Sequence, residues 1–478
     1  MLSLNNRLIE YEKEGLLSFH TPGHKGKAEF FVDLHFPAHD LTELPGLDML
    51  HAPEGVIKRA QERASEIYGS ESSFFLVNGG TVGNQGMFMA LADSRGSSPG
   101  KVLVERQSHR SVMGALVLSG LEPDYIRSIV HPEFKVPLGI AWEGLNKLPS
   151  YSAIHLTYPS YYGTVIDLAQ IIKEREEYSP QMSVLVDQAH GAHFLHDLFP
   201  AGALELGADI VMHSIHKTLS ALTQGAMLHM QGPRISLAAL KRSLEMLQSS
   251  SPNYLMMASL ERAVETALNR KPWELLYEAV EELHYRAGKV VRILNKEDEG
   301  KYGIKELDWS KIFVNTSSLG IGAYQAVEFL RNKYKIQSEF WDEENILFYL
   351  GIGNTPEEVQ QLTQGLLDLE KLKGQSSKVG FSPQEESLQD IWLSGKGFLP
   401  PRRLTPREAF IAPKVKVPLK ESIGKIVGES ISPYPPGIPL IVMGEEMTQD
   451  ILEIILAHKG KWQGWEEPLK SIWVIEEG

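Results

Sequence analysis

Lys217 is the residue of this sequence whose position best suits covalent chemistry. It follows the apolar run DIVMHS (Asp209–Ser214) by three residues, within the segment HSIHKTLSALTQG. A lysine beside the end of a buried strand has a lowered pKa and can act as a Schiff-base nucleophile. Ser214 lies where its hydroxyl can donate a hydrogen bond to a phosphate. Because most lysines are solvated surface residues, this interpretation depends on the partners that the rest of the chain provides.

A carboxylate suited to a cationic cofactor ring ends another apolar run. Asp187 closes SVLVD (Ser183–Asp187), and a carboxylate at such a position is costly unless it is paired. The protonated pyridine nitrogen of pyridoxal 5′-phosphate (PLP) would be a fitting partner. A helix cap or a loop salt bridge is the structural alternative for Asp187.

A glycine-rich segment and a histidine complete this set. VNGGTVGNQ (Val77–Gln85) follows the apolar FFLV and precedes the helical MFMALA. Its glycines let the backbone approach a ligand, and a helix N-terminus offers free N–H groups to a phosphate. His109, at a predicted helix start in SHRSVMGAL, could stack on a flat cofactor ring. A plain strand-to-helix turn and a capping histidine are the respective alternatives.

A metal site is the competing interpretation of the region after Asp187. His190, His193 and His196 form an HxxHxxH pattern near Asp187 and Asp197. A spacing of three residues does not set three ligands on one side of an extended chain, and the helical i, i+4 pair is missing. We therefore expect no metal at these histidines.

The elements that must position these residues alternate between strands and helices. Between about residues 60 and 230, apolar runs are separated by amphipathic stretches such as VIDLAQIIKEREEY (Val165–Tyr178). This alternation predicts βαβ units and a mainly parallel sheet with helices on both faces. In such sheets ligands bind beyond the carboxyl ends of the strands, where the four features above fall. The predicted strands are FFLV (Phe74–Val77), KVLV (Lys101–Val104), SAIHLT (Ser152–Thr157), SVLVD (Ser183–Asp187) and DIVMHS (Asp209–Ser214).

The rest of the chain predicts further units around this α/β core. Its length of 478 residues is too great for one ordinary core. A helical pattern from about 254 to 296 is followed by the runs KIFVNTS, AVEFLRNKY and ILFYLGIG. The polar stretch LKGQSSKVGFSPQEES lacks periodicity and predicts a linker. We expect an N-terminal arm (1–38), a large cofactor-binding domain (39–255), a small α+β domain (256–371), a linker (372–387) and a C-terminal α+β domain (388–478).

Composition narrows the partners and the location. Asp plus Glu number 61 against 47 Lys plus Arg, a formal net charge of −14, so nucleic acid and anionic membranes are not expected partners. The absence of cysteine excludes disulfides, thiolate metal sites and a cysteine nucleophile. The N-terminus has charges where a signal peptide needs an apolar core, and no apolar run approaches the roughly 20 residues of a membrane span. We expect a cytoplasmic location.

Taken in order, the motifs of this chain resemble those of the Orn/Lys/Arg decarboxylases, which are PLP enzymes of the aspartate-aminotransferase fold (type I). SxHK with an upstream DxAHG is a highly specific combination, and the PPGIPL block argues against a generic aminotransferase. The resemblance covers nearly the whole chain and is to the compact form without an N-terminal wing domain. The matching stretches are FHTPGHKG (Phe19–Gly26), LTELPGLDMLHAPEG (Leu41–Gly55), SHRSVMGALVLSG (Ser108–Gly120), VDQAHGAH (Val186–His193), SIHKTLSALTQG (Ser214–Gly225), TPREAF (Thr405–Phe410) and YPPGIPLIVMGE (Tyr434–Glu445).

The resemblance implies a role for each matching residue. Lys217 would carry PLP as a Schiff base, Asp187 would pair with the pyridine nitrogen, and His216 resembles a catalytic histidine of the family. His109 would stack on the ring, and Thr81 and Ser214, with the backbone of Gly80, would contact the phosphate. The implied cofactor-binding residues are Lys217, Asp187, His109, Gly80, Thr81, Ser214, Ala189 and His190.

Substrate choice is expected to depend on Glu339. In KIQSEFWDEENILF it aligns with an acidic residue that receives the distal amine of the substrate in related enzymes. The alternative is a solvated surface acid among several. The chain also departs from the family at Gly80, where a hydroxyl residue is common, and at Gln188, where an acid is common. Two further departures are Met49 in LDMLH and Tyr158, and all four bear on substrate choice more than on cofactor binding.

The expected reaction is α-decarboxylation of arginine, lysine or ornithine, with the proton returned to Cα by Lys217 or His216. This expectation follows from the resemblance, because PLP alone does not select decarboxylation. The family pattern and the turn-rich arm also predict a homodimer or higher homo-oligomer with active sites at the subunit interface. Another type I PLP enzyme (an aminotransferase or C–C lyase) and a non-catalytic PLP-binding protein stay open as alternatives.

Overall fold

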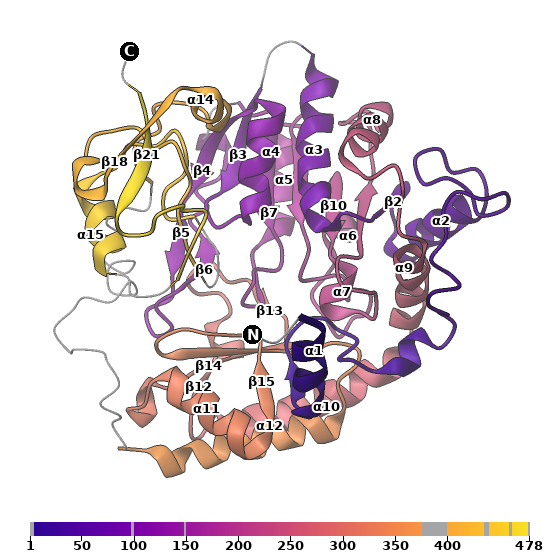
Figure 1. The fold of residues 1–478 in the computed structure, drawn as a ribbon, viewed down its shortest axis with the longest axis vertical. Coiled ribbons are helices and arrows are strands. Elements are labelled where there is room, and N and C mark those ends of the chain that lie inside the picture. Colours follow the sequence, from indigo (N-terminus) through magenta and orange to yellow (C-terminus); the bar gives the residue numbers. More distant parts are fainter. Residues whose placement is uncertain are drawn as a thin grey trace.

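The computed structural model describes residues 4–96, 100–147, 150–374, 399–434, 439–457 and 461–476. A large sheet domain is flanked by a small domain on one side and a C-terminal domain on another (Figure 1). The predicted linker, residues 372–387, lies outside the described residues from residue 375 onward.

A seven-stranded sheet forms the centre of the large domain. All five predicted strands are present, and the prediction of a mainly parallel sheet is confirmed. The pattern missed two strands, β4 at one edge and β11, which runs antiparallel to both of its neighbours. The strands, in spatial order, are β2 (Ser72–Leu76), β11 (Ala226–Met230), β10 (Ile210–His213), β9 (Ser183–Asp187), β7 (Ala153–Thr157), β3 (Lys101–Glu105) and β4 (Glu122–Ile126).

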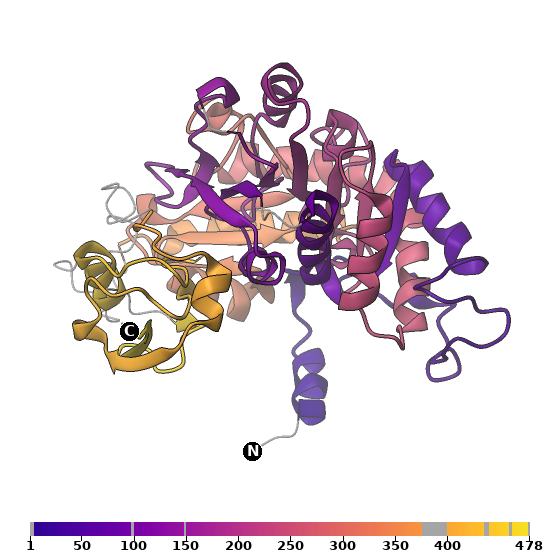
Figure 2. The ribbon, with the colours of Figure 1, turned by 90° about the horizontal axis from the view of Figure 1, so that it is seen from above.

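Both faces of this sheet are buried, as the uninterrupted apolar runs require. In β9, Leu185 packs into one hydrophobic core while its neighbours Val184 and Val186 pack into another. Helices cover both faces (Figures 1 and 2). The helices of the first core are α3 (Gly79–Arg95), α4 (Arg110–Ser119) and α8 (Leu237–Leu247). Those of the second are α2 (Val56–Tyr68), α5 (Leu168–Tyr178), α6 (Ala203–Leu206), α9 (Tyr254–Ala267) and α10 (Arg270–Ala287).

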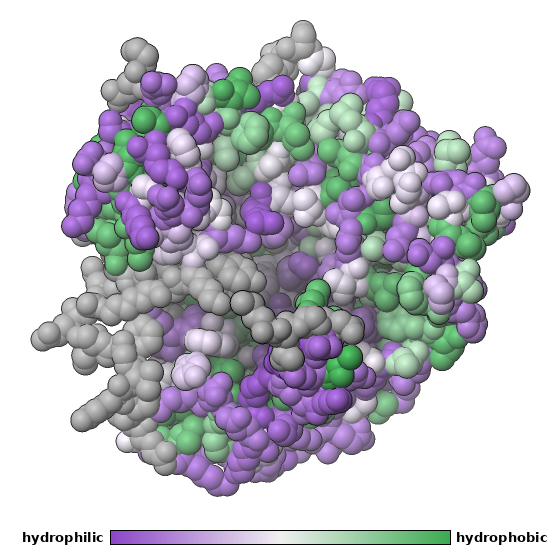
Figure 3. Space-filling view, in the orientation of Figure 1, coloured by the Kyte–Doolittle hydropathy of each residue, from purple (hydrophilic) through white to green (hydrophobic). Residues whose placement is uncertain are grey.

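The small domain is an antiparallel sheet backed by helices. Thr355 is the N-cap of α12. Its side chain accepts from the amide of Glu358, and the Glu358 side chain accepts from the amide of Thr355, so this capping box fixes the start of the helix. The space-filling view is hollowed between the large and small domains (Figure 3). The strands are β12 (Arg292–Ile293), β14 (Lys311–Asn315), β17 (Asn345–Tyr349) and β16 (Phe340–Trp341), and the helices are α11 (Ala323–Tyr334) and α12 (Pro356–Asp368).

The N-terminal arm is tied to both domains. Its helix α1 (Leu4–Lys13) stands away from the body (Figure 2), and its strand β1 (Leu17–Phe19) pairs in parallel with β15 (Ile336–Ser338). Farther along, Gly23 donates to the carbonyl of His216 at 2.7 Å and accepts from the amide of Gly353 at 3.0 Å. A Cβ at position 23 would lie 2.5 Å from the carbonyl oxygen of Leu219, so only glycine fits there.

The C-terminal domain has a core of its own and a buried ion pair to the large domain. Arg106, just after β3, makes two bonds of 2.8 and 2.9 Å to Glu445, and both side chains are almost fully buried. Arg106 also donates to the carbonyl of Leu440. The described elements are α14 (Pro406–Ile411), β18 (Lys414–Pro418), β19 (Ser432–Tyr434), α15 (Gln449–Ala457), β20 (Lys461–Gln463) and β21 (Ser471–Ile475).

In the part of the chain that the structure describes, none of the helices combines the length and the apolar character needed to cross a bilayer.

Candidate active site

Lys217 lies at the carboxyl edge of the central sheet, on the short helix α7 (Ile215–Thr218) that follows β10. Its Nζ is 2.9 Å from Nε2 of His190, which follows β9. Burial lowers the pKa of Lys217, and the carboxylates of Asp187 and Glu339 offset part of that effect. The lysine therefore has the environment of a nucleophile rather than that of a surface residue.

Asp187, at the end of β9, is buried and held by two donors. Asn84 Nδ2 donates to one carboxylate oxygen at 2.7 Å, and the amide of Ala189 donates to the other at 3.0 Å. Asn84 is on α3, one turn after Thr81, and it also donates to the hydroxyl of Ser111 at 2.9 Å. Asn84 was not predicted as a site residue, because its place in the glycine-rich helix start is its only local mark in the sequence.

His109 both caps α4 and faces the lysine. The amide of Ser111 donates to its Nδ1 at 3.2 Å, so the capping alternative is realised. Desolvation, followed by the charge of Lys217, lowers the pKa of His109 to about 4. A capped, neutral imidazole is held in a fixed orientation.

The start of α3 forms a cradle with Ser214. A Cβ on Gly80 would lie 2.7 Å from the Ser214 hydroxyl, so the glycine brings this helix end against the serine. Asn78, at the N-cap, makes no side-chain cap and accepts instead from the amide of Ser249 at 3.1 Å. The first-turn amides of α3 and the exposed Thr81 are therefore available to an anion.

His216 lies beside Lys217 but does not bond to it. Its Nδ1 is 3.0 Å from the carbonyl of Gly225, to which it donates, and burial lowers its pKa to about 4. The hydrogen-bond partner of Lys217 is His190 instead.

Glu339 lies between β15 and β16 and is half-buried. One carboxylate oxygen accepts from the amide of Thr21 at 2.8 Å, and the other accepts from the hydroxyl of Tyr161 at 3.3 Å. Its charge also raises the pKa of Lys217 against the effect of burial. Glu339 is thus a bonded acid facing the site, not a solvated one.

Two further lysines that the sequence analysis did not single out lie near Glu339. Lys25, in the arm, donates to the carbonyls of His20 at 2.6 Å and Tyr349 at 3.0 Å, and burial lowers its pKa to about 7. Lys311, on β14, is fully buried and bonds to Asp308 at 2.7 Å.

Asp308 connects the two domains below His190. It accepts from His193 of the large domain at 3.2 Å and from Lys311 of the small domain, and Lys311 also reaches the carbonyl of His190 at 3.3 Å. Although burial opposes ionisation, these two partners hold the pKa of Asp308 well below its usual range. The small domain therefore supports the loop that carries His190.

The three histidines of the HxxHxxH pattern have separate partners. His190 bonds to Lys217 and Tyr349, His193 to Asp308, and His196 to the carbonyl of Ala267 at 2.9 Å. They do not converge on a common point, so the arrangement does not support the metal alternative.

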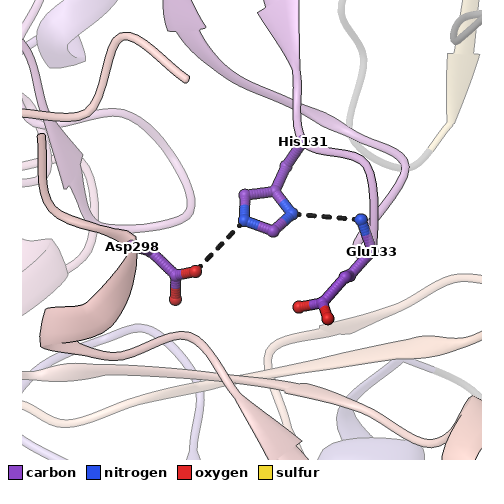
Figure 4. Close-up of side chains that lie close together, drawn as sticks. All are labelled: His131, Glu133 and Asp298. Carbon is purple, nitrogen blue, oxygen red and sulfur yellow. Dashed lines mark hydrogen bonds and ion pairs between the residues drawn. The ribbon is translucent and has the colours of Figure 1, made fainter. Parts of the chain in front are cut away.

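A different cluster, His131, Glu133 and Asp298, brings three possible metal ligands together (Figure 4). Arg292 already bonds to both carboxylates, at 2.6 Å to Glu133 and 2.5 Å to Asp298. Nδ1 of His131 accepts from the amides of Glu133 and Phe134, so Nε2 carries the proton and donates to Asp298 at 3.3 Å. The ion pairs and hydrogen bonds of this cluster therefore link the large and small domains.

Comparison with known proteins identifies the fold and the family of the chain. A solved structure of the constitutive lysine decarboxylase of Escherichia coli matches with a TM-score of 0.75 at 20% identity, covering 99% of this chain and 81% of that one. The fold is that of the PLP-dependent enzymes of fold type I. The family model described as Orn/Lys/Arg decarboxylase, major domain, matches residues 3–302, and the model of the C-terminal domain matches residues 398–464. The chain belongs to the Orn/Lys/Arg decarboxylase family.

Two relatives match over most of their length. An uncharacterized protein of Bacillus subtilis (strain 168), YaaO, is 35% identical over 468 residues, covering 94% of this chain and 92% of that protein. An arginine decarboxylase of Bacillus anthracis is 32% identical over 463 residues, covering 94% and 91%. The resemblance stated from the motifs is thereby confirmed.

Proposed function

We propose that this chain removes the α-carboxyl group of a basic amino acid, with PLP bound at Lys217, and releases the amine and CO₂. The observation that supports it most is the meeting of Lys217, Asp187 and the Gly80–Ser214 cradle at one edge of the sheet. The family is PLP-dependent in general, and its members decarboxylate basic amino acids.

The residues present fit PLP. The uncapped start of α3, with Thr81 and the Ser214 hydroxyl, would hold the phosphate. Asp187, fixed by Asn84 and Ala189, would keep a proton on the ring nitrogen. When bound there, PLP would supply an electron sink for the electron pair that stays on Cα when the carboxylate leaves as CO₂.

The chain's own residues would orient the reacting groups and handle the proton. His109, fixed by its cap on α4, would lie against the ring. Lys217 would return the proton to Cα, because its Nζ faces the site. His216, next in the chain to Lys217, is the second candidate; because Nδ1 donates its proton to the Gly225 carbonyl, Nε2 would first have to take up a proton before it could deliver one.

We propose that Glu339 receives the distal cation of the substrate. It is the carboxylate of the small domain whose charge reaches Lys217, and a buried cation without such a partner is expensive. Relatives named arginine decarboxylase, at 30–32% identity, support arginine as the first substrate to test, followed by lysine and ornithine.

The same proposal includes a homodimer or higher homo-oligomer in the cytoplasm, with the amine product feeding polyamine biosynthesis. Helix α1 stands off the body with Leu4 and Leu8 exposed by 77% and 59% (Figure 2). Phe36, in the segment before the large domain, is exposed by 75%. Apolar side chains on such a projecting arm favour a second copy as their partner.

The test measures CO₂ release from arginine, lysine and ornithine in parallel, and then maps the cofactor. Borohydride reduction of the PLP-loaded protein should fix the adduct on Lys217, and Lys217→Ala should release no CO₂. Lys25 and Lys311 are buried lysines on which the charge of Glu339 acts, so peptide mapping that finds the adduct on either one overturns the assignment. No CO₂ from any of the three substrates would overturn the function.

A further inference from the structure

A chain of hydrogen bonds links Lys217 to the small domain. Lys217 Nζ lies 2.9 Å from His190 Nε2, and His190 Nδ1 lies 3.2 Å from the hydroxyl of Tyr349. Tyr349 ends β17 and is fully buried, and its hydroxyl bonds to the backbone carbonyl of Tyr161. We call these four residues the relay.

The direction of the bonds at Tyr349 follows from the chemistry of their ends. The carbonyl of Tyr161 can only accept, so the single hydroxyl proton of Tyr349 goes to it. The oxygen of Tyr349 must then accept from an N–H at Nδ1 of His190. Burial raises the pKa of Tyr349 well above its ordinary value, so the phenol keeps its proton.

The protonation of His190 decides what its other nitrogen can do. Burial, followed by the charge of Lys217, lowers the pKa of His190 well below its ordinary value, so the ring carries one proton. With that proton on Nδ1, Nε2 presents a lone pair to Lys217 and accepts its N–H. Tyr349 thus selects the tautomer of His190, and the tautomer selects the direction of an N–H of the lysine.

We propose that Tyr349 and His190 are positioning residues for Lys217. By accepting one N–H from Lys217, His190 orients the lysine nitrogen and stabilises the ammonium form of this buried side chain. Tyr349 acts through His190. Because Tyr349 belongs to the small domain, the placement of that domain controls a lysine of the large domain. The inference rests on the proposed function, in which Lys217 is the residue that reacts.

Groups outside the relay also act on the pKa of Lys217. Burial is the main influence on the pKa of Lys217; Asp187 and Glu339 raise it and Lys311 lowers it. Variants of the relay leave these groups in place, so a change in Lys217 reports the relay itself. The groups that face Lys217 or His190 are Asp187 after β9, Glu339 between β15 and β16, Lys311 on β14, His109 before α4, His216 on α7 and Tyr349 on β17.

The test titrates Lys217 in the full chain after dialysis against hydroxylamine, which removes PLP. A limiting amount of 1-fluoro-2,4-dinitrobenzene would label amines across the alkaline range, with Lys217 quantified by peptide mapping and the exposed Lys58 as internal reference. In Tyr349→Phe the apparent pKa of Lys217 should fall by about one unit, or tenfold in ionisation constant, because the ammonium loses a fixed acceptor. A titration that matches wild type overturns the proposal.

A double variant tests whether Tyr349 acts through His190. His190→Phe keeps a flat ring without either nitrogen and should lower the pKa of Lys217 by a similar amount. Adding Tyr349→Phe to it should then cause no further fall, since the route is already broken. Additive shifts would show an independent route and would overturn the relay.

Tyr162→Phe is the matched control. Tyr162 is buried next to Tyr161, and its hydroxyl has no hydrogen-bond partner among the residues that the structure describes. Its removal should leave the titration of Lys217 unchanged, and a shift equal to that of Tyr349→Phe would refute the relay. Labelling is done without PLP, so the relay is measured even if adduct mapping places the cofactor elsewhere and the proposed function fails.

Discussion

Two histidine-rich clusters contact the central sheet, and they differ in how their nitrogens are used. At the carboxyl edge, His190 and His193 bond to Lys217 and Asp308 through distances of 2.9 and 3.2 Å. Inside the sheet, His213 on β10 and His229 on β11 pack with ring centroids 4.7 Å apart. Neither nitrogen of His213 has a hydrogen-bond partner among the described residues.

A lowered pKa does not by itself mark a functional site. Burial lowers the pKa of His213 well below its ordinary value and that of His229 to about 3, as it does for His190. Of the two clusters, only the edge cluster has histidines that bond to charged side chains among the described residues, and one of these bonds crosses a domain boundary. Such charged partners are typical of catalytic sites. Directed partners, and not the titration alone, separate the two clusters.

Removing the carboxylate that pairs with Lys311 in the edge cluster should destabilise the protein strongly. Asp308→Asn leaves the ammonium of Lys311 buried without a carboxylate, which should cost about 3–5 kcal/mol of stability. The shift in urea midpoint can be followed by intrinsic tryptophan fluorescence, to which Trp273, with its ring 5.5 Å from that of His193, contributes.

The matched control replaces the pair together. Asp308→Asn with Lys311→Met removes both charges and should recover most of the lost stability, because no unpaired ion remains. A single variant as stable as wild type would mean that Lys311 finds another partner, and the contrast between the clusters would lose its basis.

A smaller effect separates one histidine of each cluster. His193→Leu takes a donor from Asp308 and should cost about 1–3 kcal/mol, whereas His213→Leu removes no hydrogen bond and should cost about 1 kcal/mol or less. Urea unfolding of the two variants above neutral pH makes the comparison. Equal losses would show that packing, and not pairing, dominates in both places.

Glu339→Gln tests whether the carboxylate of Glu339 binds the substrate. Losing the carboxylate should raise KM about tenfold, or ~1.4 kcal/mol, while the interior cluster is untouched. Glu344→Gln, nearby in sequence and paired to Lys135 at 3.2 Å, should leave KM as it was. A KM for Glu339→Gln within about twofold of wild type, ~0.4 kcal/mol, would send the search to another acid.

The smallest effect is on acid stability. A histidine whose folded pKa is depressed binds protons more readily when unfolded, so stability falls as pH drops from about 6.5 toward the folded value. His229, with a pKa of about 3, and His213 both contribute to this loss. His213→Leu should move the midpoint of acid unfolding down by a few tenths of a pH unit, measured by circular dichroism, and an upward shift would contradict it.

The strands could be predicted where the apolar pattern is unbroken. SVLVD became β9 with its bounds intact, whereas β4, EPDYI, carries a proline and two acids at the sheet edge and gives no such pattern. Strand β11, AMLHM, holds a buried histidine and was likewise missed. Burial on both faces produces the pattern, and edge position or buried polar residues remove it.

Only those site residues that a local sequence pattern marks could be predicted. Asp187 was found because it ends an apolar strand, and Lys217 because it follows one closely; parallel strands bring such ends together. Tyr349 reaches His190 across 159 residues, and nothing near it in sequence marks it out from other tyrosines that end strands. Contacts that depend on how two domains meet have no local pattern.

The buried pair of Arg106 and Glu445 has a consequence for the order of synthesis. Its two members are 339 residues apart in the chain. A ribosome adding about 5–20 residues per second needs roughly 20–70 s to travel that distance. Throughout this interval the guanidinium of Arg106 has no Glu445 to pair with and must stay hydrated, even after the strands of the central sheet have been made. A chain that ends before Glu445 therefore leaves the guanidinium of Arg106 without its buried carboxylate partner.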